Sequence, residues 1–227
     1  MKIAVLLFHS NIKSIYKQRW IDVCLNSIIN QTYNDFIFYE INYGGDNYSV
    51  LENKKIEQKS KFWSSKKENH VEAMNFLLDK VCEDDCDLVF NVNLDDFYDL
   101  RRFEMQIFAA IKNKADVISS DFSYIQEVED VYDLIISNMN VCQYKDINAT
   151  LKHDKNIIAH PCVCYSKNFI KDNRYNSNII PEEDWDLWKR TCDKYKIFII
   201  DEVLLYYRIH KKQITKLNSQ QNFIKIQ

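Results

Sequence analysis

The chain has 227 residues, of which 46% are hydrophobic and 28% are charged, as expected of a globular protein with a full-sized core. Its formal net charge of -3 gives no reason to expect a nucleic-acid partner. Its apolar runs are too short to cross a bilayer, so we expect no integral membrane segment.

The cysteine and glycine contents narrow the class further. Seven cysteines, an odd number without a clear zinc-binding spacing, favour a reducing compartment, so we expect a cytoplasmic protein. Gly44 and Gly45 are the only glycines. The glycine-rich loops of dinucleotide-binding and P-loop enzymes are therefore excluded. Any bound diphosphate must be held by a metal and side chains.

The first half of the chain alternates predicted strands with predicted helices. Residues 3–8 predict a buried strand rather than a signal peptide, because no small-residue cleavage site follows them. The lysine-rich stretch 52–68 predicts a loop with a short helix. The remaining periodic segments predict strands over 36–41, 88–92 and 116–119, and helices over 16–28, 71–82 and 100–111. This order predicts parallel βαβ units.

The second half is less regular. Its periodic segments predict a strand over 160–165, a helical turn near Asn168, a helix over 184–195 and strands over 197–200 and 203–208. Arg190, about two turns into the helix, is predicted to form a structural ion pair. Residues from Lys211 onward are polar and predict a terminal helix or a tail.

Polar residues follow three of the predicted strands. The segments 9–11, 42–46 and 93–96 each begin where a strand ends, and the carboxyl ends of parallel strands bind ligands. Asp95 and Asp96 directly follow a buried apolar run. Adjacent carboxylates repel one another and lose hydration there, and a divalent cation offsets that cost. A second acidic group, residues 182–186, lies far downstream.

Five segments in order resemble family 2 glycosyltransferases of the GT-A fold, and the resemblance covers nearly the whole chain. Residues 20–33 resemble the first helix with its Ser-Ile-x-x-Gln-Thr-Tyr ending. The other four are Ala73-Met74-Asn75, Asn93-Leu94-Asp95-Asp96, the Glu-Asp-x-x-Leu-Trp-x-Arg helix at 183–190, and Tyr207-Arg208-Ile209-His210. Each segment is weak alone, but five in order are specific.

The resemblance implies a Rossmann-like, three-layer α/β fold with a central, mainly parallel sheet between helices. It implies one domain over 1–227, with a nucleotide-sugar half over about 1–115, an acceptor half over about 116–210 and a helix or tail over 211–227. The implied reaction is metal-dependent, inverting transfer of a sugar from a nucleotide diphosphate, with UDP favoured, to a hydroxyl of a glycan or glycoconjugate.

The donor side is expected to use oxygen ligands. Asp95 is predicted to bind Mn²⁺ or Mg²⁺ directly, and His210 is either a further ligand or an ordinary strand-end residue. Asp96 and Asn93 are predicted to contact the ribose, the sugar or a water. The alternative for the acidic pair is a turn that caps the following helix. Further nucleotide contacts are expected from His9, Asn11, Asn42 and Asp46.

The acceptor side is expected to supply a base. Asp184 is the predicted general base that deprotonates the attacking hydroxyl, and Glu183 is the second candidate. The alternative is that both carboxylates only favour the helix N-terminus electrostatically. Trp185 is a candidate platform for the acceptor sugar. His160 either lines the acceptor side or belongs to a structural turn.

Two departures from the family pattern leave other functions open. Asn93 replaces the usual first Asp of the metal motif, and Tyr43 stands where an Asp often recognises the base. A degenerate domain that binds a sugar nucleotide or glycan without turnover is therefore an alternative. A sugar nucleotidyltransferase is disfavoured, because no glycine-rich loop follows the first strand.

Overall fold

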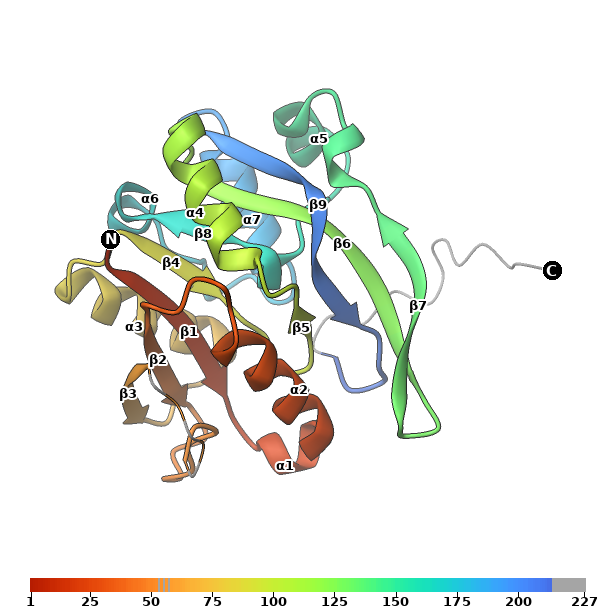
Figure 1. Ribbon diagram of the computed structural model, residues 1–227. Coiled ribbons are helices and arrows are strands. Elements are labelled where there is room, and N and C mark those ends of the chain that lie inside the picture. Colours follow the sequence, from red (N-terminus) through yellow and green to blue (C-terminus); the bar gives the residue numbers. More distant parts are fainter. Residues whose placement is uncertain (53, 55, 57, 214–227) are drawn as a thin grey trace.

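The computed structural model describes residues 1–52, 54, 56 and 58–213, and within them the chain builds a nine-stranded mixed sheet (Figure 1). The strand order is β3-β2-β1-β4-β8-β6-β9-β5, and β7 pairs with β6. The elements are β1 (Ile3–His9), α1 (Ile12–Ile15), α2 (Gln18–Ile29), β2 (Ile37–Asn42), β3 (Lys59–Ser64), α3 (His70–Glu83), β4 (Leu88–Asn91), β5 (Phe97–Tyr98), α4 (Arg102–Asn113), β6 (Val117–Val128), β7 (Tyr132–Met139), η1 (Val141–Gln143), α5 (Ile147–His153), η2 (His160–Cys162), β8 (Cys164–Ser166), α6 (Lys167–Asp172), α7 (Glu183–Thr191) and β9 (Ile197–Arg208).

The predicted three-layer α/β class is confirmed. Strands β3, β2, β1 and β4 are mutually parallel, so the predicted βαβ units are present. Figure 1 shows α2 and α4 on one face of the sheet and α3, α6 and α7 on the other. With both faces covered, β1 and β4 carry continuous apolar runs rather than an alternating pattern.

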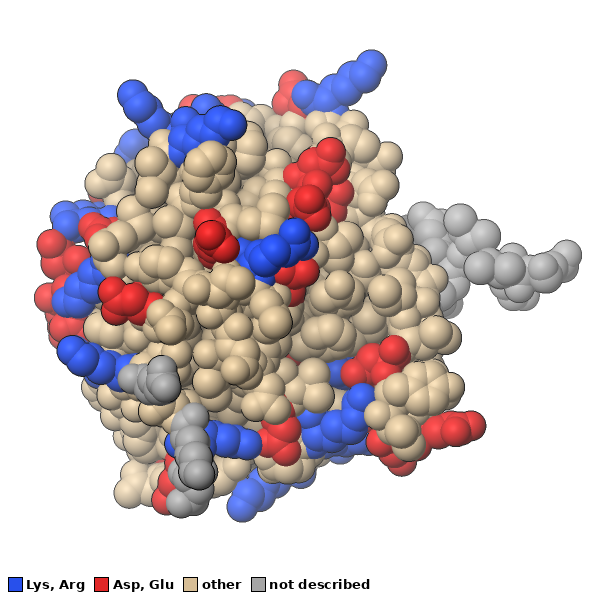
Figure 2. All heavy atoms as spheres, in the orientation of Figure 1, with Lys and Arg blue, Asp and Glu red and all other residues tan. Residues whose placement is uncertain are grey.

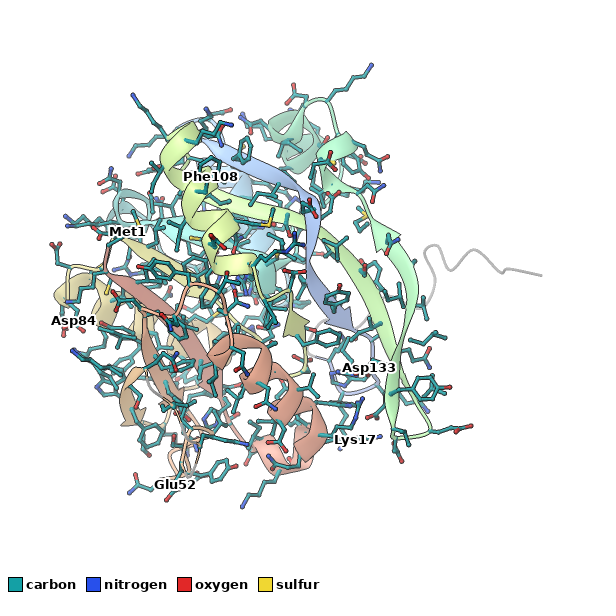
Figure 3. The ribbon with its side chains drawn as sticks, in the orientation of Figure 1. Met1, Lys17, Glu52, Asp84, Phe108 and Asp133 are labelled. Atoms are coloured by element: carbon teal, nitrogen blue, oxygen red, sulfur yellow. The ribbon has the colours of Figure 1, made fainter. Side chains whose placement is uncertain are left out.

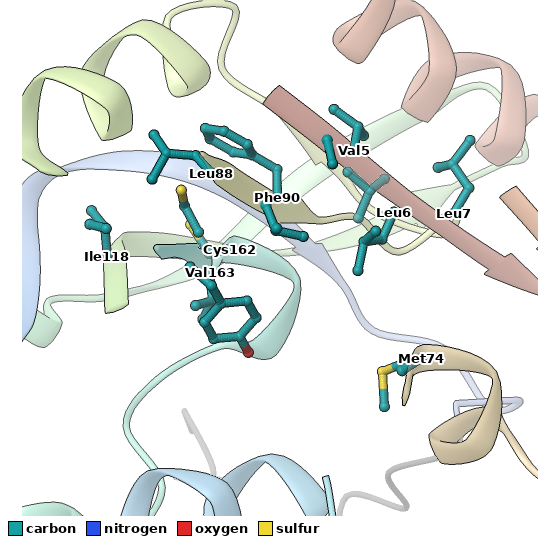
Figure 4. Close-up of a cluster of buried hydrophobic side chains, with 14 of the residues drawn as sticks. Val5, Leu6, Leu7, Met74, Leu88, Phe90, Ile118, Cys162 and Val163 are labelled. Atoms are coloured by element: carbon teal, nitrogen blue, oxygen red, sulfur yellow. The ribbon is translucent and has the colours of Figure 1, made fainter. Parts of the chain in front are cut away.

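The core lies where β1 and β4 meet the helices and the second half of the chain. Figure 4 shows Val5, Leu6 and Leu7 of β1 beside Phe90 of β4. Met74 of α3 belongs to the same buried cluster. These side chains are at most 1% exposed. Burying one such side chain stabilises the fold by about 1.5–3 kcal/mol. This packing fixes the strands whose ends carry the polar segments.

The second half of the sheet is mixed. β8 pairs antiparallel with both β4 and β6, whereas β6 and β9 run parallel. The predicted strand over 160–165 is shorter than expected, because residues 160–162 form the 3-10 turn η2. The helical turn near Asn168 is confirmed as α6, and the ion pair of Arg190 is confirmed with Asp186, at 2.7 Å.

A long hairpin, β6–β7, projects beyond the sheet. Its outer residues Leu134 and Ile135 are each 52% exposed. Its tip is held by α2 and the segment before it: Lys17 pairs with Asp130, and Arg19 contacts Asp133 at 3.2 Å. Figure 3 shows Lys17 and Asp133 at the corner where the hairpin approaches α1 and α2.

Several predicted elements were wrong or incomplete. Residues 59–64, predicted as loop and short helix, form edge strand β3, whose polar side chains are largely exposed and whose backbone pairs with β2. The strands predicted over 197–200 and 203–208 are one strand, β9, with a register shift opposite Asp121. Neither β5 nor β7 was predicted. The predicted helix or tail over 211–227 lies outside the described residues from 214 onward.

The described helices are all too short or too polar to cross a membrane. Figure 2 shows basic and acidic side chains interspersed over the visible face, without a broad basic patch there.

Candidate functional site

The three polar segments predicted to meet do lie at one edge of the sheet. β1 is paired in parallel with β2 and β4, and His9 is in register with Asn42. The segments that follow these strands therefore leave the sheet on the same side. They open into two hollows, one beside Asp95 and a smaller one beside Asn42.

Asp95 and Asp96 are held by the end of β9. The backbone N–H of Arg208 donates to Asp96 Oδ1 at 2.8 Å, and Arg208 Nε donates to the carbonyl of Asp95 at 2.7 Å. His210 Nε2 lies 2.9 Å from Asp95 Oδ2. The end of β9 and the residues after it thus contact the acidic pair, and the role of His210 as a metal ligand remains a prediction.

Unpartnered oxygen atoms cluster at this exit of β4. Asn93 Oδ1, Asp95 Oδ1 and Asp96 Oδ2 are all buried without a hydrogen-bond partner. Burial and the neighbouring Asp95 raise the pKa of Asp96 well above its ordinary value. Buried acceptors without donors are costly, and oxygen atoms are the ligands that Mg²⁺ and Mn²⁺ prefer. The residues present therefore fit a divalent cation with Asp95 as its ligand and ligand hydroxyls nearby.

The smaller hollow is lined by Asn11, Asn42 and Asp46, together with Lys13 and Tyr48. The Asn42 amide is already engaged, since its Nδ2 donates to Asp46 Oδ1 at 2.6 Å and its Oδ1 accepts the Gly44 N–H at 3.0 Å. The loop is therefore ordered around the buried Asn42, whereas Asp46, Asn11 and Lys13 are exposed polar residues of the hollow.

His9 lies beneath this edge and does not line either hollow. It is 3% exposed, and its Nε2 is 2.8 Å from Glu40 Oε1. Its Nδ1 is buried without a partner. The predicted contact of His9 with a nucleotide remains a prediction, and the structure places the imidazole where it also supports the loop after β2.

Asp184 and Glu183 begin α7 and line the larger hollow. Asn156 Nδ2 donates to Asp184 Oδ2 at 3.1 Å. Burial, together with the charge of Glu183, raises the pKa of Asp184 to about 6. His70 Nε2 lies 2.8 Å from Glu183 Oε1. Burial works to raise the pKa of Glu183, but the hydrogen bond and charge of His70 outweigh it, so that pKa is lowered.

Glu183 and Asp184 thus differ in their surroundings. Glu183 is hydrogen-bonded to His70 and its pKa is lowered, whereas Asp184 is half-buried and its pKa is raised to about 6. A general base works best when its pKa lies near the operating pH. By this criterion Asp184, the predicted base, suits that role better than Glu183 does.

His160 and Trp185 also line the larger hollow. His160 Nε2 is 2.8 Å from Tyr175 Oη, and burial lowers the pKa of His160 to about 4. Its imidazole is therefore neutral at physiological pH. Trp185 Nε1 donates to the Leu151 carbonyl at 2.7 Å, which fixes the orientation of the indole.

Sequence reasoning missed the residues that complete the wall of the larger hollow. They come from four separate segments and share no motif: His70, Phe122, Tyr124, Met139, Asn156 and Ile157. His70 and Asn156 are the hydrogen-bond partners of the two carboxylates. Only tertiary pairing, across 113 residues for His70 and Glu183, brings them together.

Elsewhere among the described residues, Asp121, Cys142 and Asp201 place ligand-type atoms within 4.8 Å of one another. The Cys142 thiol lies 3.0 Å from Asp201 Oδ1 and 3.3 Å from Asp121 Oδ2. The hydrogen bond to Asp201, with further contributions from burial and Asp121, raises the pKa of Cys142 to about 12. The single S–H can donate to one of the two carboxylates at a time, and the backbone N–H of Cys142 donates to Asp121 Oδ1 at 3.0 Å.

Comparisons with known proteins identify a curated relative and solved structures that are similar to this chain. No family model matches the chain. The O-antigen biosynthesis glycosyltransferase WbnJ of Escherichia coli is 26% identical over 224 residues, which cover 95% of this chain and 85% of WbnJ. The chain is therefore similar in sequence to a glycosyltransferase over nearly its whole length.

Solved structures support the same fold. The structure of TarS from S. aureus has a TM-score of 0.64 and 15% identity, and covers 92% of this chain. TarS residues 1–349 with UDP-GlcNAc give a TM-score of 0.64 and 16% identity over 93% of this chain. The match spans only 37% of the longer TarS chain and 59% of the shorter one. At these identities the likeness establishes the fold alone.

Proposed function

We propose that this protein is a glycosyltransferase that moves a sugar from a UDP-sugar to a hydroxyl of a glycan or glycoconjugate, with a divalent cation and with inversion. The observation that carries the proposal is one hollow lined by both Asp95, with its unpartnered oxygen, and Asp184, a half-buried carboxylate whose pKa is raised. A cation ligand and a base on one cavity are the parts that such a transfer needs.

On the donor side, Asp95 would hold the cation with His210 beside it. The cation, Mn²⁺ or Mg²⁺, would stabilise the negative charge on the departing diphosphate. Asp96 and Asn93 have buried acceptor oxygens suited to ribose or sugar hydroxyls. The smaller hollow with Asp46 and Asn11 is the proposed site of the base.

On the acceptor side, Asp184 would take the proton from the attacking hydroxyl. Its pKa of about 6 leaves it mostly ionised at neutral pH, yet basic enough to accept the proton as the new bond forms. Asn156 would orient the carboxylate through Oδ2. Glu183 and His70 would hold the first turn of α7, and Trp185 and His160 would contact the acceptor sugar.

One further observation favours UDP as the donor nucleotide. TarS, which shares the fold, has been solved with UDP and with UDP-GlcNAc. The departure at Tyr43 makes the base the part of this proposal that most needs an experiment.

A thermal-shift screen with UDP-, GDP-, CMP- and dTDP-sugars, each with and without Mn²⁺, tests the donor. A ligand at one hundred times its Kd stabilises the native state by about 2.7 kcal/mol. We expect a rise of the midpoint with a UDP-sugar and Mn²⁺, and a much smaller rise in Asp95→Asn. Binding without sugar release or transfer would favour the degenerate domain, and no response to any donor would contradict the proposed donor class.

A further inference from the structure

The larger hollow has an unbalanced charge. It is a cavity of about 430 Å³, and its wall includes the carboxylates of Asp95, Glu182, Glu183 and Asp184. Among the described residues, no lysine or arginine lines it. A cation on Asp95 would be shared with the donor diphosphate, so it would not reverse this balance at the acceptor end.

The two histidines of the wall do not supply a free positive charge. Burial lowers the pKa of His160 to about 4, so that imidazole is neutral. His70 is engaged by Glu183, at 2.8 Å. Whatever charge His70 carries is already opposed by its partner.

The buried arginines nearest to the acidic pair point elsewhere. Arg208 pairs with Asp133 and with the carbonyl of Asp95. Arg102 donates to Gln106 Oε1 at 3.0 Å and to the Asn91 carbonyl at 2.9 Å. Neither guanidinium lines the hollow.

The rest of the wall suits the apolar faces of a sugar ring. Aromatic and aliphatic side chains from β6, β7, β9 and the segment before η2 line it: Phe122, Tyr124, Met139, Ile157 and Tyr207. Aromatic rings pack against C–H groups, while the carboxylates and amides accept or donate hydrogen bonds to hydroxyls. An anionic group in this wall would lose hydration without gaining a cationic partner.

We propose that the acceptor sugar of this enzyme is uncharged: a neutral hexose or N-acetylhexosamine, rather than a uronic acid, a sialic acid or a sugar phosphate. The inference rests on the proposed function, because it takes this hollow as the place where the acceptor hydroxyl meets Asp184. It adds the chemical class of the acceptor, which the fold does not determine.

Matched acceptor pairs test the proposal. The probes are p-nitrophenyl glucoside and galactoside against the corresponding glucuronide and galacturonide, which differ only in a CH₂OH or carboxylate at C6. N-acetylglucosaminide and N-acetylgalactosaminide complete the neutral set. Transfer is measured with the UDP-sugar that the donor screen selects, and release of UDP in the absence of acceptor is the independent sign of a working donor site.

We expect at least one neutral probe to be used with kcat/KM about tenfold or more above that of its acidic counterpart, the size of one unfavourable charge contact of about 1.4 kcal/mol. Equal use, preference for the acidic probe, or no use of any neutral probe despite UDP release would overturn the proposal. Failure of UDP release and donor binding together would instead contradict the proposed function.

A wall variant provides a second test. Met139 is half-buried at the end of β7 and lines the hollow, so Met139→Lys would add a cation to the wall, and Met139→Gln is its uncharged control. We expect the lysine variant to narrow the gap between neutral and acidic probes by about tenfold, and the glutamine variant to leave it unchanged. The same gap in both variants would contradict a wall that selects by charge.

Discussion

The donor edge and the acceptor wall of the site are built in opposite ways. At the donor edge, the segment 93–96 after β4 carries three buried oxygens without partners, on Asn93, Asp95 and Asp96. The acceptor wall comes from distant segments, and its polar groups are paired with one another: His70 with Glu183, and Asn156 with Asp184.

The difference matches the roles proposed for the two regions. Buried acceptors without donors are costly, and the proposed cation and ligand hydroxyls would offset that cost at the donor edge. The carboxylates of Glu183 and Asp184 in the acceptor wall already have hydrogen-bond partners within the protein, and Asn156 orients the carboxylate of Asp184. Preorganised groups of this kind are what an enzyme needs at the reacting hydroxyl.

The largest expected effect separates the two regions functionally. Asp184→Asn removes the proposed base but keeps its shape, so we expect kcat to fall by about 10²–10⁴-fold while UDP-sugar binding changes little. Steady-state kinetics and calorimetry measure the two quantities. Asp186→Asn, on the same helix but outside the hollow, is the matched control and should retain activity. An active Asp184→Asn enzyme would exclude Asp184 as the base.

The second prediction concerns the link between the β6–β7 hairpin and the donor edge. Arg208 is 0% exposed and joins Asp133 of the β6–β7 hairpin to the backbone of Asp95. Removing one member of a buried ion pair costs about 3–5 kcal/mol. We therefore expect Arg208→Met to lower the free energy of unfolding by that amount and to weaken metal-dependent donor binding.

Arg19 provides the control for that experiment. It contacts the same carboxylate, Asp133, but its side chain is 30% exposed. Partly exposed pairs contribute about 1 kcal/mol or less, so Arg19→Met should be clearly milder in chemical denaturation. Equal losses of unfolding free energy in the two variants would show that Arg208 is not the connection between the hairpin and the metal motif.

The smallest expected effect concerns pH and stability. The pKa of Asp184 in the native state, about 6, is above its ordinary value of 3.8. The native state therefore holds this proton more tightly, and the resulting stabilisation is full below pH 3.8 and is lost as pH rises through about 6. An asparagine does not titrate. The midpoint of thermal unfolding of Asp184→Asn, taken relative to that of the unsubstituted protein, should therefore be higher at about pH 7.5 than at about pH 4.

Thermal unfolding of both proteins at the two pH values measures this difference. A difference independent of pH would mean that Asp184 is not a desolvated carboxylate in the native state. The same ionisation predicts that kcat/KM rises with pH through about 6, because the base acts in its ionised form.

Local patterns determined the parallel half of the fold. Buried apolar runs and amphipathic helices recur from residue 3 to residue 113, and β1, β2, β4, α2, α3 and α4 match the predicted segments. A parallel strand covered on both faces must be apolar throughout, so its signal is contained in a few residues. The donor-side residues after β4 could be predicted for the same reason.

Tertiary structure decided the rest. Edge strand β3 and hairpin strand β7 are polar or exposed. They are held by backbone pairing with β2 and β6, and local sequence patterns do not predict these partners. The Glu183–Asp184 pair is visible in the sequence, but only the fold brings His70 to Glu183 and Asn156 to Asp184, as hydrogen-bond partners of the two carboxylates. Burial and charge are properties of the folded surroundings, so the pKa values that distinguish these two carboxylates depend on contacts between segments far apart in the chain.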